Sequence, residues 1–322
     1  MYSTFANGVL GITALDIDVV YTWVNHLDET WQALYDQACS TLQQSGPLHE
    51  SANTLARFQN RNELLFSIKS VKKYAPWVRH IYVVSNCELP GELLSDKQVA
   101  WVRHEDIFPD PGVLPNFNSR AIESNLHRIE GLSQHFLYFN DDFFLCRPAH
   151  REDFFSDDGK VYVFPSKHDM PYDKEAVLSP FEHGALNACR LITEDTGYVP
   201  RKRLHHAPYA LVRDTLYEIE NRYKTLVDAT RTHKFRDNTD IPLATSMHAY
   251  YSVALGRGEL RDIPCRYVDI GDPLFLLLVH PLSPLRRGKY MIFCMNEITE
   301  IRHFPGLRDR FVARLLRKMF GD

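Results

Sequence analysis

Two adjacent carboxylates, Asp141 and Asp142, directly follow a short apolar stretch at 136–139 and precede two phenylalanines. In open α/β sheets, ligands bind at the carboxyl ends of strands, where one or two carboxylates can hold Mg²⁺ or Mn²⁺ together with substrate phosphates. The alternative interpretation of Asn140-Asp141-Asp142 is an ordinary solvated turn. Because large aromatic residues rarely surround a solvated turn, the pattern favours a cation site.

A histidine that could act as a base, His206, lies two residues before Pro208. Proline is favoured at the first position of a helix, so we expect a helix to begin here, with Leu211 and Leu216 on its buried side. The positive end of the helix dipole would lower the pKa of the imidazole and keep it neutral, as a base requires. A capping or surface histidine is the alternative on spacing alone.

Further polar residues lie beside other expected elements. Arg236 is in a polar run before an expected helix, where phosphate binding is physically natural, and a solvated loop with an Arg-Asp pair is the alternative. Arg57 and Asn62 open another expected helix with the same ambiguity. Asn296 and Glu297 follow an apolar stretch and repeat the arrangement of the first carboxylate pair.

Composition sets the outer limits. The chain has 322 residues, 44% hydrophobic and 24% charged, which is a normal globular balance for one large or two ordinary domains. A formal charge of −4 gives no general attraction to nucleic acid or anionic lipid, so an anionic substrate would need local basic residues. Because 18 apolar residues nowhere run together, we expect no transmembrane segment.

The cysteines and the first residues indicate a reducing compartment. Six cysteines lie far apart without a Cys-x-x-Cys pair, which argues against a zinc site or a disulfide framework and favours free thiols. The first fifteen residues lack the basic start and apolar core of a secretory signal. We therefore expect a cytoplasmic protein.

Strand and helix patterns alternate along the chain. Apolar, β-branched or aromatic runs predict strands at 18–24, 80–85, 99–104 and 136–140, and helical spacing predicts helices at 29–44, 62–74 and 118–129, the last capped by Asn118. This alternation predicts an α/β fold with a mainly parallel sheet and helices on both faces. The segment 153–200, rich in Asp, Pro and Gly, is expected to form an irregular lid.

In order, spacing and residue type, these motifs resemble the Stealth family, which includes bacterial capsular-polysaccharide hexose-1-phosphate transferases and the animal N-acetylglucosamine-1-phosphotransferase that marks lysosomal enzymes. The motifs that carry the resemblance are Asp16-Ile17-Asp18-Val19-Val20-Tyr21-Thr22-Trp23-Val24-Asn25, Asn62-Glu63-Leu64, Ala75-Pro76-Trp77-Val78, Ala121-Ile122-Glu123, Asn140-Asp141-Asp142, His206-x-Pro208, Phe235-Arg236 and the stretch ending in Asn296. Counterparts of the four conserved regions are expected at about 16–41, 52–158, 201–255 and 286–322, with a variable insertion at about 159–200.

The resemblance implies a fold and an activity. The fold would be a Rossmann-like, GT-A-related sheet in a single catalytic domain, 1–322, with an inserted irregular or helical lid. The activity would be transfer of a hexose or N-acetylhexosamine 1-phosphate from a UDP-sugar to a hydroxyl of a glycan or sugar-phosphate polymer, with release of UMP, in capsule or exopolysaccharide synthesis. Such an enzyme would work in the cytoplasm or at the inner face of the membrane.

The resemblance also implies roles for single residues. Asp142, with Asp141 as its partner, would hold Mg²⁺ or Mn²⁺; His206 would take the acceptor proton; Arg236 would bind phosphate oxygens. The donor would be contacted by Tyr21, Thr22, Trp23, Asn25, Arg57, Asn62, Ser119 and Asn296. Two positions depart from the family pattern, because Glu297 stands where Asp is usual and Phe143 stands where a smaller aliphatic residue is common.

Two other functions are compatible with the same residues. A glycosyltransferase would use the same fold, cation and UDP-sugar, but it would cleave at the anomeric carbon and release UDP. A non-catalytic glycan- or nucleotide-binding module would have no use for a histidine base beside a cation site. Analysis of the nucleotide product distinguishes the three.

Overall fold

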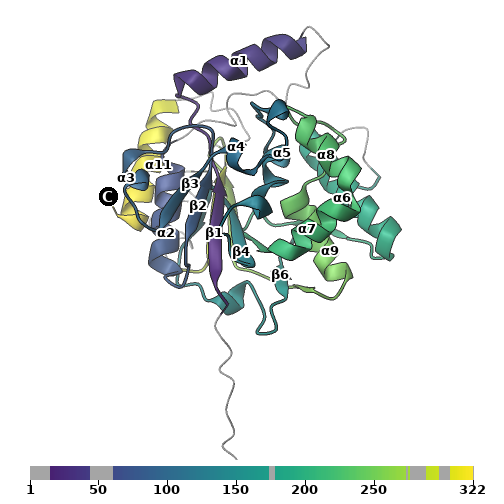
Figure 1. The fold of residues 1–322 in the computed structure, drawn as a ribbon. Coiled ribbons are helices and arrows are strands. Elements are labelled where there is room, and N and C mark those ends of the chain that lie inside the picture. Colours follow the sequence, from purple (N-terminus) through teal and green to yellow (C-terminus); the bar gives the residue numbers. More distant parts are fainter. Residues whose placement is uncertain are drawn as a thin grey trace, which may run out of the picture.

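The fold is described from a computed structural model, which places residues 15–43, 61–173, 178–272, 275, 288–296 and 305–321. Its centre is a sheet with strand order β3-β2-β1-β4-β9 (Figure 1). The first four of these strands run parallel to one another, and β9 runs antiparallel to β4. The predicted mainly parallel sheet is confirmed. The strands are β1 (Ile17–Thr22), β2 (Ile81–Val84), β3 (Val99–Val102), β4 (His135–Asn140) and β9 (Tyr209–Val212).

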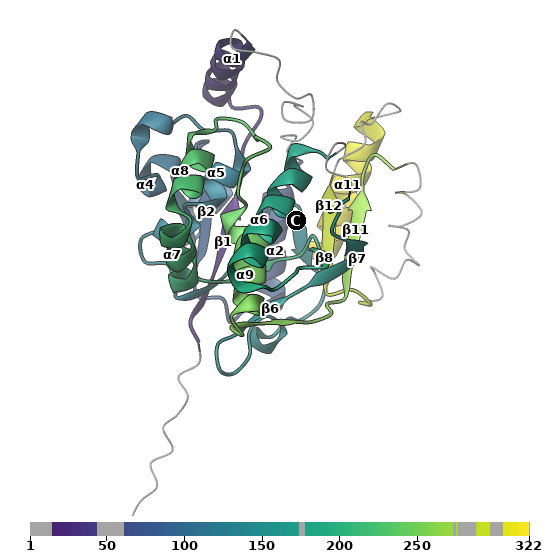
Figure 2. The same cartoon turned by 90° about the vertical axis from the view of Figure 1, so that its right-hand side faces the viewer.

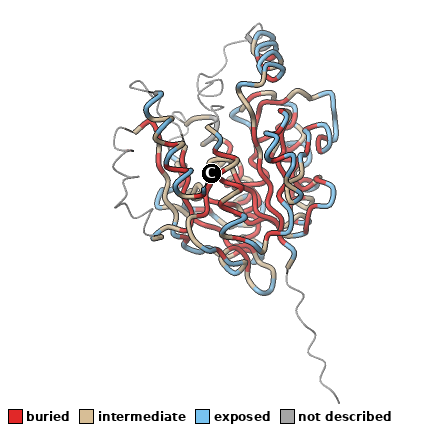
Figure 3. Tube along the Cα trace, turned by 90° about the vertical axis from the view of Figure 1, so that its left-hand side faces the viewer, coloured by how far each residue is buried: buried red, intermediate tan, exposed pale blue. Residues whose placement is uncertain are grey.

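Helices cover both faces of this sheet, as predicted. Val19 of β1 belongs to the hydrophobic cluster that contains Ile68 of α2, whereas Val20 belongs to the cluster that contains Leu186 of α6 and Leu216 of α7. The central strands are thereby buried between the more exposed helices (Figure 3). The helices are α1 (Glu29–Gln43), α2 (Glu63–Tyr74), α3 (Gly91–Leu94), α4 (His104–Ile107), α5 (Ser119–Glu123), α6 (Pro180–Thr196), α7 (Arg213–Arg222), α8 (Lys224–Thr232), α9 (His248–Ala254) and α11 (Pro305–Phe320), with shorter turns η3 (Pro111–Val113), η4 (Leu126–Arg128), η5 (Arg151–Asp153) and η7 (Leu243–Met247).

A second sheet, of order β11-β12-β5, lies beside the first and is covered by α11 (Figure 2). Phe144 of β5 and Phe293 of β12 pack with Val312 of α11 in a third hydrophobic cluster. The strands outside the central sheet are β5 (Phe143–Leu145), β6 (Val161–Val163), β7 (Pro165–Asp169), β8 (Lys202–Leu204), β10 (Gly258–Leu260), β11 (Cys265–Asp269) and β12 (Ile292–Asn296), where β6 pairs with β10 and β7 with β8.

The helix predicted at 118–129 is shorter than expected. Asn118 caps α5 as predicted, because its side chain accepts a hydrogen bond from the backbone N–H of Arg120 at 3.0 Å. The side chains of Ser124 and Asn125 then both donate to the carbonyl of Ala121, at 2.7 and 2.8 Å. Side chains that bond back to the preceding turn compete with the helix ladder, and α5 ends at Glu123.

The prediction that a helix begins at Pro208 is wrong. Residues Tyr209–Val212 form β9 instead, because they pair antiparallel with the open edge of β4, and α7 begins only at Arg213. The prediction that residues 153–200 form an irregular lid is also partly wrong. A helix of 17 residues, α6, lies within it, with a capping box at Ser179 and Gly197 at its carboxyl end in the left-handed conformation (φ 74°).

Two other expectations concern the whole chain. All six cysteines lie in the described part of the chain and each is a free thiol, as predicted. No helix within the described ranges is both long and apolar enough to cross a membrane.

An ion pair with a buried carboxylate joins the amino ends of three adjacent strands. Asp18 of β1 is fully buried and accepts from Arg79 at 2.9 and 2.6 Å. Its carboxylate also accepts from the backbone N–H of His80 at 3.1 Å and of Ser133 at 2.7 Å. His80 lies just before β2 and Ser133 just before β4. One carboxylate on β1 therefore fixes where all three strands start.

We expect Asp18→Ala to lower the free energy of unfolding by about 3–5 kcal/mol, because it leaves a guanidinium and two backbone N–H groups without their acceptor. Urea unfolding followed by circular dichroism measures the change. Asp16→Ala is the matched control, since Asp16 is exposed two residues earlier and should change stability by only about 0.5 kcal/mol. Equal effects of the two substitutions would contradict the role given to the pair.

Candidate active site

The acidic pair lies in the turn between β4 and β5, at the carboxyl end of the central sheet. β4 ends at Asn140 and β5 begins at Phe143, so Asp141 and Asp142 belong to neither strand. Successive side chains on a strand point to opposite faces, and adjacent carboxylates can share a ligand only where the strand has stopped. The structure meets that condition.

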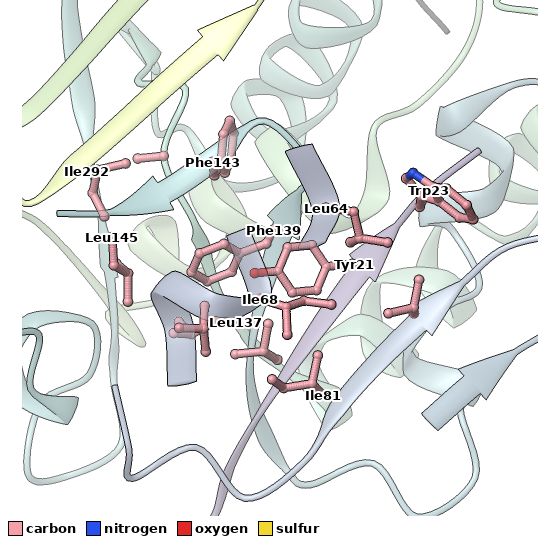
Figure 4. Packing of buried hydrophobic residues seen from close by; sticks show 14 of the residues in the cluster. Tyr21, Trp23, Leu64, Ile68, Ile81, Leu137, Phe139, Phe143, Leu145 and Ile292 are labelled. Atoms are coloured by element: carbon pink, nitrogen blue, oxygen red, sulfur yellow. The ribbon is translucent and has the colours of Figure 1, made fainter. Parts of the chain in front are cut away.

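Packing beneath the turn fixes its position (Figure 4). Phe139 and Phe143, on either side of the pair, are fully buried, and the ring of Phe139 lies 5.4 Å from that of Tyr21. The Tyr21 hydroxyl hydrogen-bonds Ser67 of α2 at 2.8 Å, and Ser67 donates to the backbone carbonyl of Phe143. Tyr21 thus supports the turn from inside the core, and its predicted contact with a nucleotide stays a prediction.

The two carboxylates are held in an unfavourable electrostatic environment. Burial raises the pKa of Asp142 to about 7, and burial together with the charge of Asp142 raises the pKa of Asp141 to about 7. The thiol of Cys294 donates to Oδ2 of Asp142 at 3.4 Å. Oδ1 of the same carboxylate is buried and has no hydrogen-bond partner among the described residues. An unsatisfied buried carboxylate oxygen is costly, which marks it as a place for a ligand.

These carboxylates fit a hard divalent cation such as Mg²⁺ or Mn²⁺. Such cations prefer carboxylate oxygens and commonly complete their shell with substrate phosphates and water. In the ranges that the structure describes, no group of three or more His, Cys, Asp or Glu side chains is arranged to hold a metal. A cation here would therefore take Asp142 and Asp141 from the chain and its remaining oxygens from a bound ligand.

Glu63 is a third carboxylate near the pair, and its place in the sequence did not reveal it. It is only 5% exposed, and burial followed by the charge of Asp141 raises its pKa to about 7. An acidic residue in the first turn of a helix is ordinary, so the sequence indicated only the start of α2. Asn62 precedes Glu63 in the left-handed conformation (φ 68°). Arg57 lies outside the described residues.

His206 lies in the loop between β8 and β9 and not at the start of a helix. Its pKa is lowered to about 4, first by burial and then by the neighbouring charges of His205 and Arg120. The expected direction of the pKa shift is therefore confirmed, but the helix dipole is not its cause. The imidazole is neutral at working pH, as a base must be.

A short path of contacts leads from His206 to Asp142. The imidazole lies 5.0 Å from the ring of Tyr267 on β11. Tyr267 is in register with Cys294 on β12, and the thiol of Cys294 reaches Asp142. Asp142 also contributes to the raised pKa of Tyr267. The structure thus brings the predicted base and the predicted cation site together, through two residues that the sequence analysis did not select.

Arg236 lies in the loop that precedes the helical segment η7–α9, as expected, and its guanidinium also reaches the first residue of α5. Its Nε and one Nη donate to the hydroxyl of Ser119, at 3.2 and 2.7 Å. The charges of Arg120 and Arg236 both lower the pKa of Glu123, against the larger raising effect of burial. The predicted phosphate-binding residue Arg236 is therefore in direct contact with Ser119, which was predicted to contact the donor.

Asp240 holds the loop that carries Arg236. It is 1% exposed, and its Oδ2 accepts from the side chain of Asn118 at 2.8 Å and from the backbone N–H of Asp237 at 2.9 Å. Its Oδ1 bonds Nδ1 of His233 at 2.7 Å, which raises the pKa of that histidine. Because Asn118 also caps α5, one carboxylate fixes both Ser119 and the loop of Arg236.

An aromatic cluster attaches α1 to the same loop. Trp31 and Tyr35 of α1 stack at 4.9 Å, and the ring of Tyr35 lies 5.2 Å from Phe117 and 5.6 Å from Phe235. Phe117 and Phe235 themselves stack at 5.6 Å. Asn118 directly follows Phe117, and Arg236 directly follows Phe235. The cluster therefore holds the backbone next to both of these polar residues.

The end of β1 contributes a hydrogen-bonded row beside the acidic turn. Thr22 Oγ1 bonds the hydroxyl of Tyr138 at 2.9 Å, and that hydroxyl lies 3.4 Å from Oε1 of Glu123. Glu123 is buried beside Arg120, at 3.4 Å. The sequence gave no signal for this burial, because opposite charges three residues apart are common on exposed helix surfaces.

The remaining predicted donor residues that the structure describes follow the carboxyl end of β1 or end β12. Trp23 is 6% exposed, and its Nε1 has no partner within the described residues. Asn25 accepts from the backbone N–H of Leu27 at 3.1 Å. Asn296 lies two residues after Cys294 on β12 and therefore on the same face. Glu297 lies outside the described residues.

Family models match three segments of the chain. They are conserved region 1 of the Stealth proteins at 15–40, conserved region 2 at 57–163 and conserved region 3 at 205–252. The matches cover the acidic turn, His206 and Arg236. The chain belongs to the Stealth family. The expected counterpart of a fourth region at 286–322 stays a prediction.

Named Stealth relatives are phosphotransferases. The chain is 39% identical over 305 residues to the exopolysaccharide phosphotransferase SCO6023 of Streptomyces coelicolor, covering 93% of this chain and 50% of that protein. It is 35% identical over 263 residues to the capsular polysaccharide phosphotransferase fcs1 of Haemophilus influenzae, covering 80% and 71%. The chain spans about half the length of SCO6023 and of two other exopolysaccharide phosphotransferases of Streptomyces coelicolor that it matches.

Solved structures that are similar to this Stealth chain are glycosyltransferases. The galactosyltransferase LgtC, with donor and acceptor sugar analogs, has a TM-score of 0.43 at 9% identity and covers 94% of this chain and 96% of its own. Mouse xyloside xylosyltransferase 1 has a TM-score of 0.41 at 10% identity and covers 87% and 97%. At these TM-scores the likeness carries no further argument, and the expected GT-A relation stays a prediction.

Asp142→Asn should raise the melting temperature of the chain without added metal, because the amide keeps the shape of the side chain and removes a buried charge. A gain of about 1 kcal/mol corresponds to roughly 1.5 °C in a chain of this size. A carboxyl with a raised pKa lowers stability where it is ionised, so the gain should be largest above pH 7 and should vanish towards pH 4.

Differential scanning calorimetry at pH 8 and pH 5 measures this gain. Asp157→Asn is the matched control, since Asp157 is exposed and should leave the melting temperature unchanged. A lower melting temperature for Asp142→Asn at pH 8 would mean that the carboxylate stabilises the fold, against the electrostatics described above.

Proposed function

We propose that this chain transfers a hexose or N-acetylhexosamine 1-phosphate from a UDP-sugar to a hydroxyl of an acceptor glycan or sugar-phosphate polymer, with release of UMP. The names of its relatives support phosphate transfer in capsular or exopolysaccharide synthesis. One observation carries the proposal, namely that a turn of carboxylates suited to a cation lies close to a neutral imidazole, with Tyr267 and Cys294 between them. Phosphoryl transfer needs charge neutralisation and a positioned base more than covalent catalysis.

The acceptor oxygen would attack the phosphorus that carries the sugar. A new bond forms between that oxygen and phosphorus, the bond from phosphorus to the bridging oxygen of the diphosphate breaks, and UMP leaves. His206 takes the proton of the acceptor hydroxyl. A cation held by Asp142 and Asp141 would neutralise charge on the diphosphate.

Arg236 supports the proposal on the side of the phosphates. A guanidinium can bind two oxygens of one phosphate at once, and Ser119 holds this one in place at 2.7 Å. Thr22, Trp23 and Asn25 follow one another around the carboxyl end of β1, where a nucleotide binds in many α/β folds. We assign these three residues, with Asn62 and Asn296, to the donor side.

The test is the identity of the released nucleotide. The chain is incubated with each of a panel of UDP-sugars, an acceptor glycan and Mg²⁺ or Mn²⁺, and the nucleotides are separated by chromatography. We expect UMP and a phosphodiester product, and no turnover in excess chelator. UDP as the sole nucleotide would instead identify a glycosyltransferase, and binding without any turnover would identify a binding module.

His206→Ala should lower kcat by roughly 10²- to 10⁴-fold, because the base that takes the acceptor proton is lost, while the affinity for the UDP-sugar changes little. In the unmodified chain the imidazole loses its proton above about pH 4, so turnover should fall only below that pH, and this acid limb should be absent from the variant. Steady-state kinetics across pH measures both effects.

His205→Ala is the matched control, since the charges that act on its imidazole are those of Asp262, His168 and Lys167. It should keep most of its turnover. If His205→Ala is the inactive variant and His206→Ala turns over normally, the base is the neighbouring residue; if both are active, neither is the base.

A further inference from the structure

We infer that the hydroxyl of Tyr267 donates a hydrogen bond to the transferred phosphoryl group, as a substrate-contacting residue of this site. The inference rests on the proposed function, because it requires a donor diphosphate at the acidic turn. Tyr267 lies on β11, outside the three segments that match the Stealth regions. It is therefore not among the residues that the matched conserved regions cover.

Two unsatisfied polar atoms of opposite hydrogen-bonding character lie in this part of the site. The Tyr267 hydroxyl oxygen and Oδ1 of Asp142 are both buried, and neither has a hydrogen-bond partner among the residues that the structure places. They belong to side chains that influence each other electrostatically, and Cys294 lies between them in the sheet. Buried polar atoms are nearly always paired, so two such atoms in one site indicate a ligand.

The character of the two atoms identifies the kind of ligand. A phenol hydroxyl keeps its proton at neutral pH and can donate to an anionic oxygen, whereas an ionised carboxylate can only accept or bind a cation. A cation with a phosphate on it satisfies both atoms at once, since the carboxylate takes the cation and the hydroxyl takes a phosphate oxygen. A neutral sugar hydroxyl could pair with both atoms, but it would leave the charge of the Asp142 carboxylate without a cation.

The position of Tyr267 indicates which phosphate of the donor its hydroxyl contacts. Its ring lies 5.0 Å from the imidazole of His206, which takes the acceptor proton in the proposed reaction. The phosphorus under attack must lie between that base and the cation on Asp142. The hydroxyl therefore lies closest to the sugar-bearing phosphate of the donor, and the α-phosphate and the uridine lie further away.

The experiment compares UDP with UMP, because the two differ only in the second phosphate. Affinity for each nucleotide in the presence of Mn²⁺ is measured by isothermal titration calorimetry on the unmodified chain and on Tyr267→Phe. We expect the affinity for UDP to fall about 10-fold or more, the range for a hydrogen bond to a charged group, and that for UMP to stay unchanged. Turnover of the UDP-sugar should fall with the UDP affinity or further.

Tyr251→Phe is the matched control. Its hydroxyl bonds Glu218 at 2.8 Å on α7, away from the acidic turn, and its loss should change neither affinity nor turnover. The melting temperature of each variant shows whether it is folded. Equal loss of UDP and UMP affinity in Tyr267→Phe, or loss of neither, would overturn the inference.

The binding measurement needs no turnover, so the inference and the proposed function can fail separately. If the unmodified chain releases UDP from UDP-sugars and Tyr267→Phe still loses UDP affinity alone, the proposed reaction is wrong and the phosphate contact remains. If UMP is released and the two affinities do not diverge, the reaction remains and the contact is wrong. Failure of the unmodified chain to bind either nucleotide with Mn²⁺ would overturn both.

Discussion

Two carboxylates that are neighbours in sequence cannot meet while they belong to a strand, and the architecture of this protein depends on where the strand stops. β4 runs through the core to Asn140 and then leaves the central sheet. After the turn, β5 pairs antiparallel with β12, and the backbone N–H of Met295 donates to the carbonyl of Asp142 at 3.0 Å. The same break that frees the carboxylates therefore brings in the second sheet, with Cys294, Asn296 and Tyr267.

The hydrogen-bond partners of the carboxylates distinguish those that hold the fold together from the one that is available to a ligand. Asp18 and Asp240 are each surrounded by donors and are fully engaged in joining segments of the chain. Asp142 has one weak donor, the thiol of Cys294, and one oxygen without a partner among the described residues. A fold that satisfies some acids completely and leaves another unsatisfied has kept that one for a ligand, at some expense in stability.

The parts of the fold that the sequence predicted are those determined locally. Continuous apolar runs gave β1, β2 and β4, and helical spacing gave α1 and α2, because burial on both faces or on one stripe leaves a direct trace in residue order. The segment after Pro208 was mistaken for a helix because proline suits a first turn, whereas its partner, the edge of β4, is more than seventy residues away in register. Edge pairing of this kind has no local signal.

The residues of the candidate site also fall into those that the sequence predicted and those that it did not. Asp141, Asp142 and His206 were selected because chemistry-bearing residues follow apolar runs or carry family motifs. Glu63, Glu123 and Tyr267 were not, since each owes its environment to contacts across different elements, and an acid in a first helical turn or a tyrosine in a strand is unremarkable in sequence. The neutral state of His206 was expected for the wrong reason, because burial by distant segments replaced the helix dipole.

The stacking of α1 on Phe117 and Phe235 has a kinetic consequence for Arg236. A long flexible side chain on a mobile loop must lose conformational entropy each time it closes on a phosphate. Here Phe235 is packed between aromatic rings, so the backbone next to Arg236 loses that freedom once, during folding. Ligand binding then needs only small adjustments of the guanidinium, and phosphate capture by this loop can proceed at the rate of encounter without waiting for the loop to order.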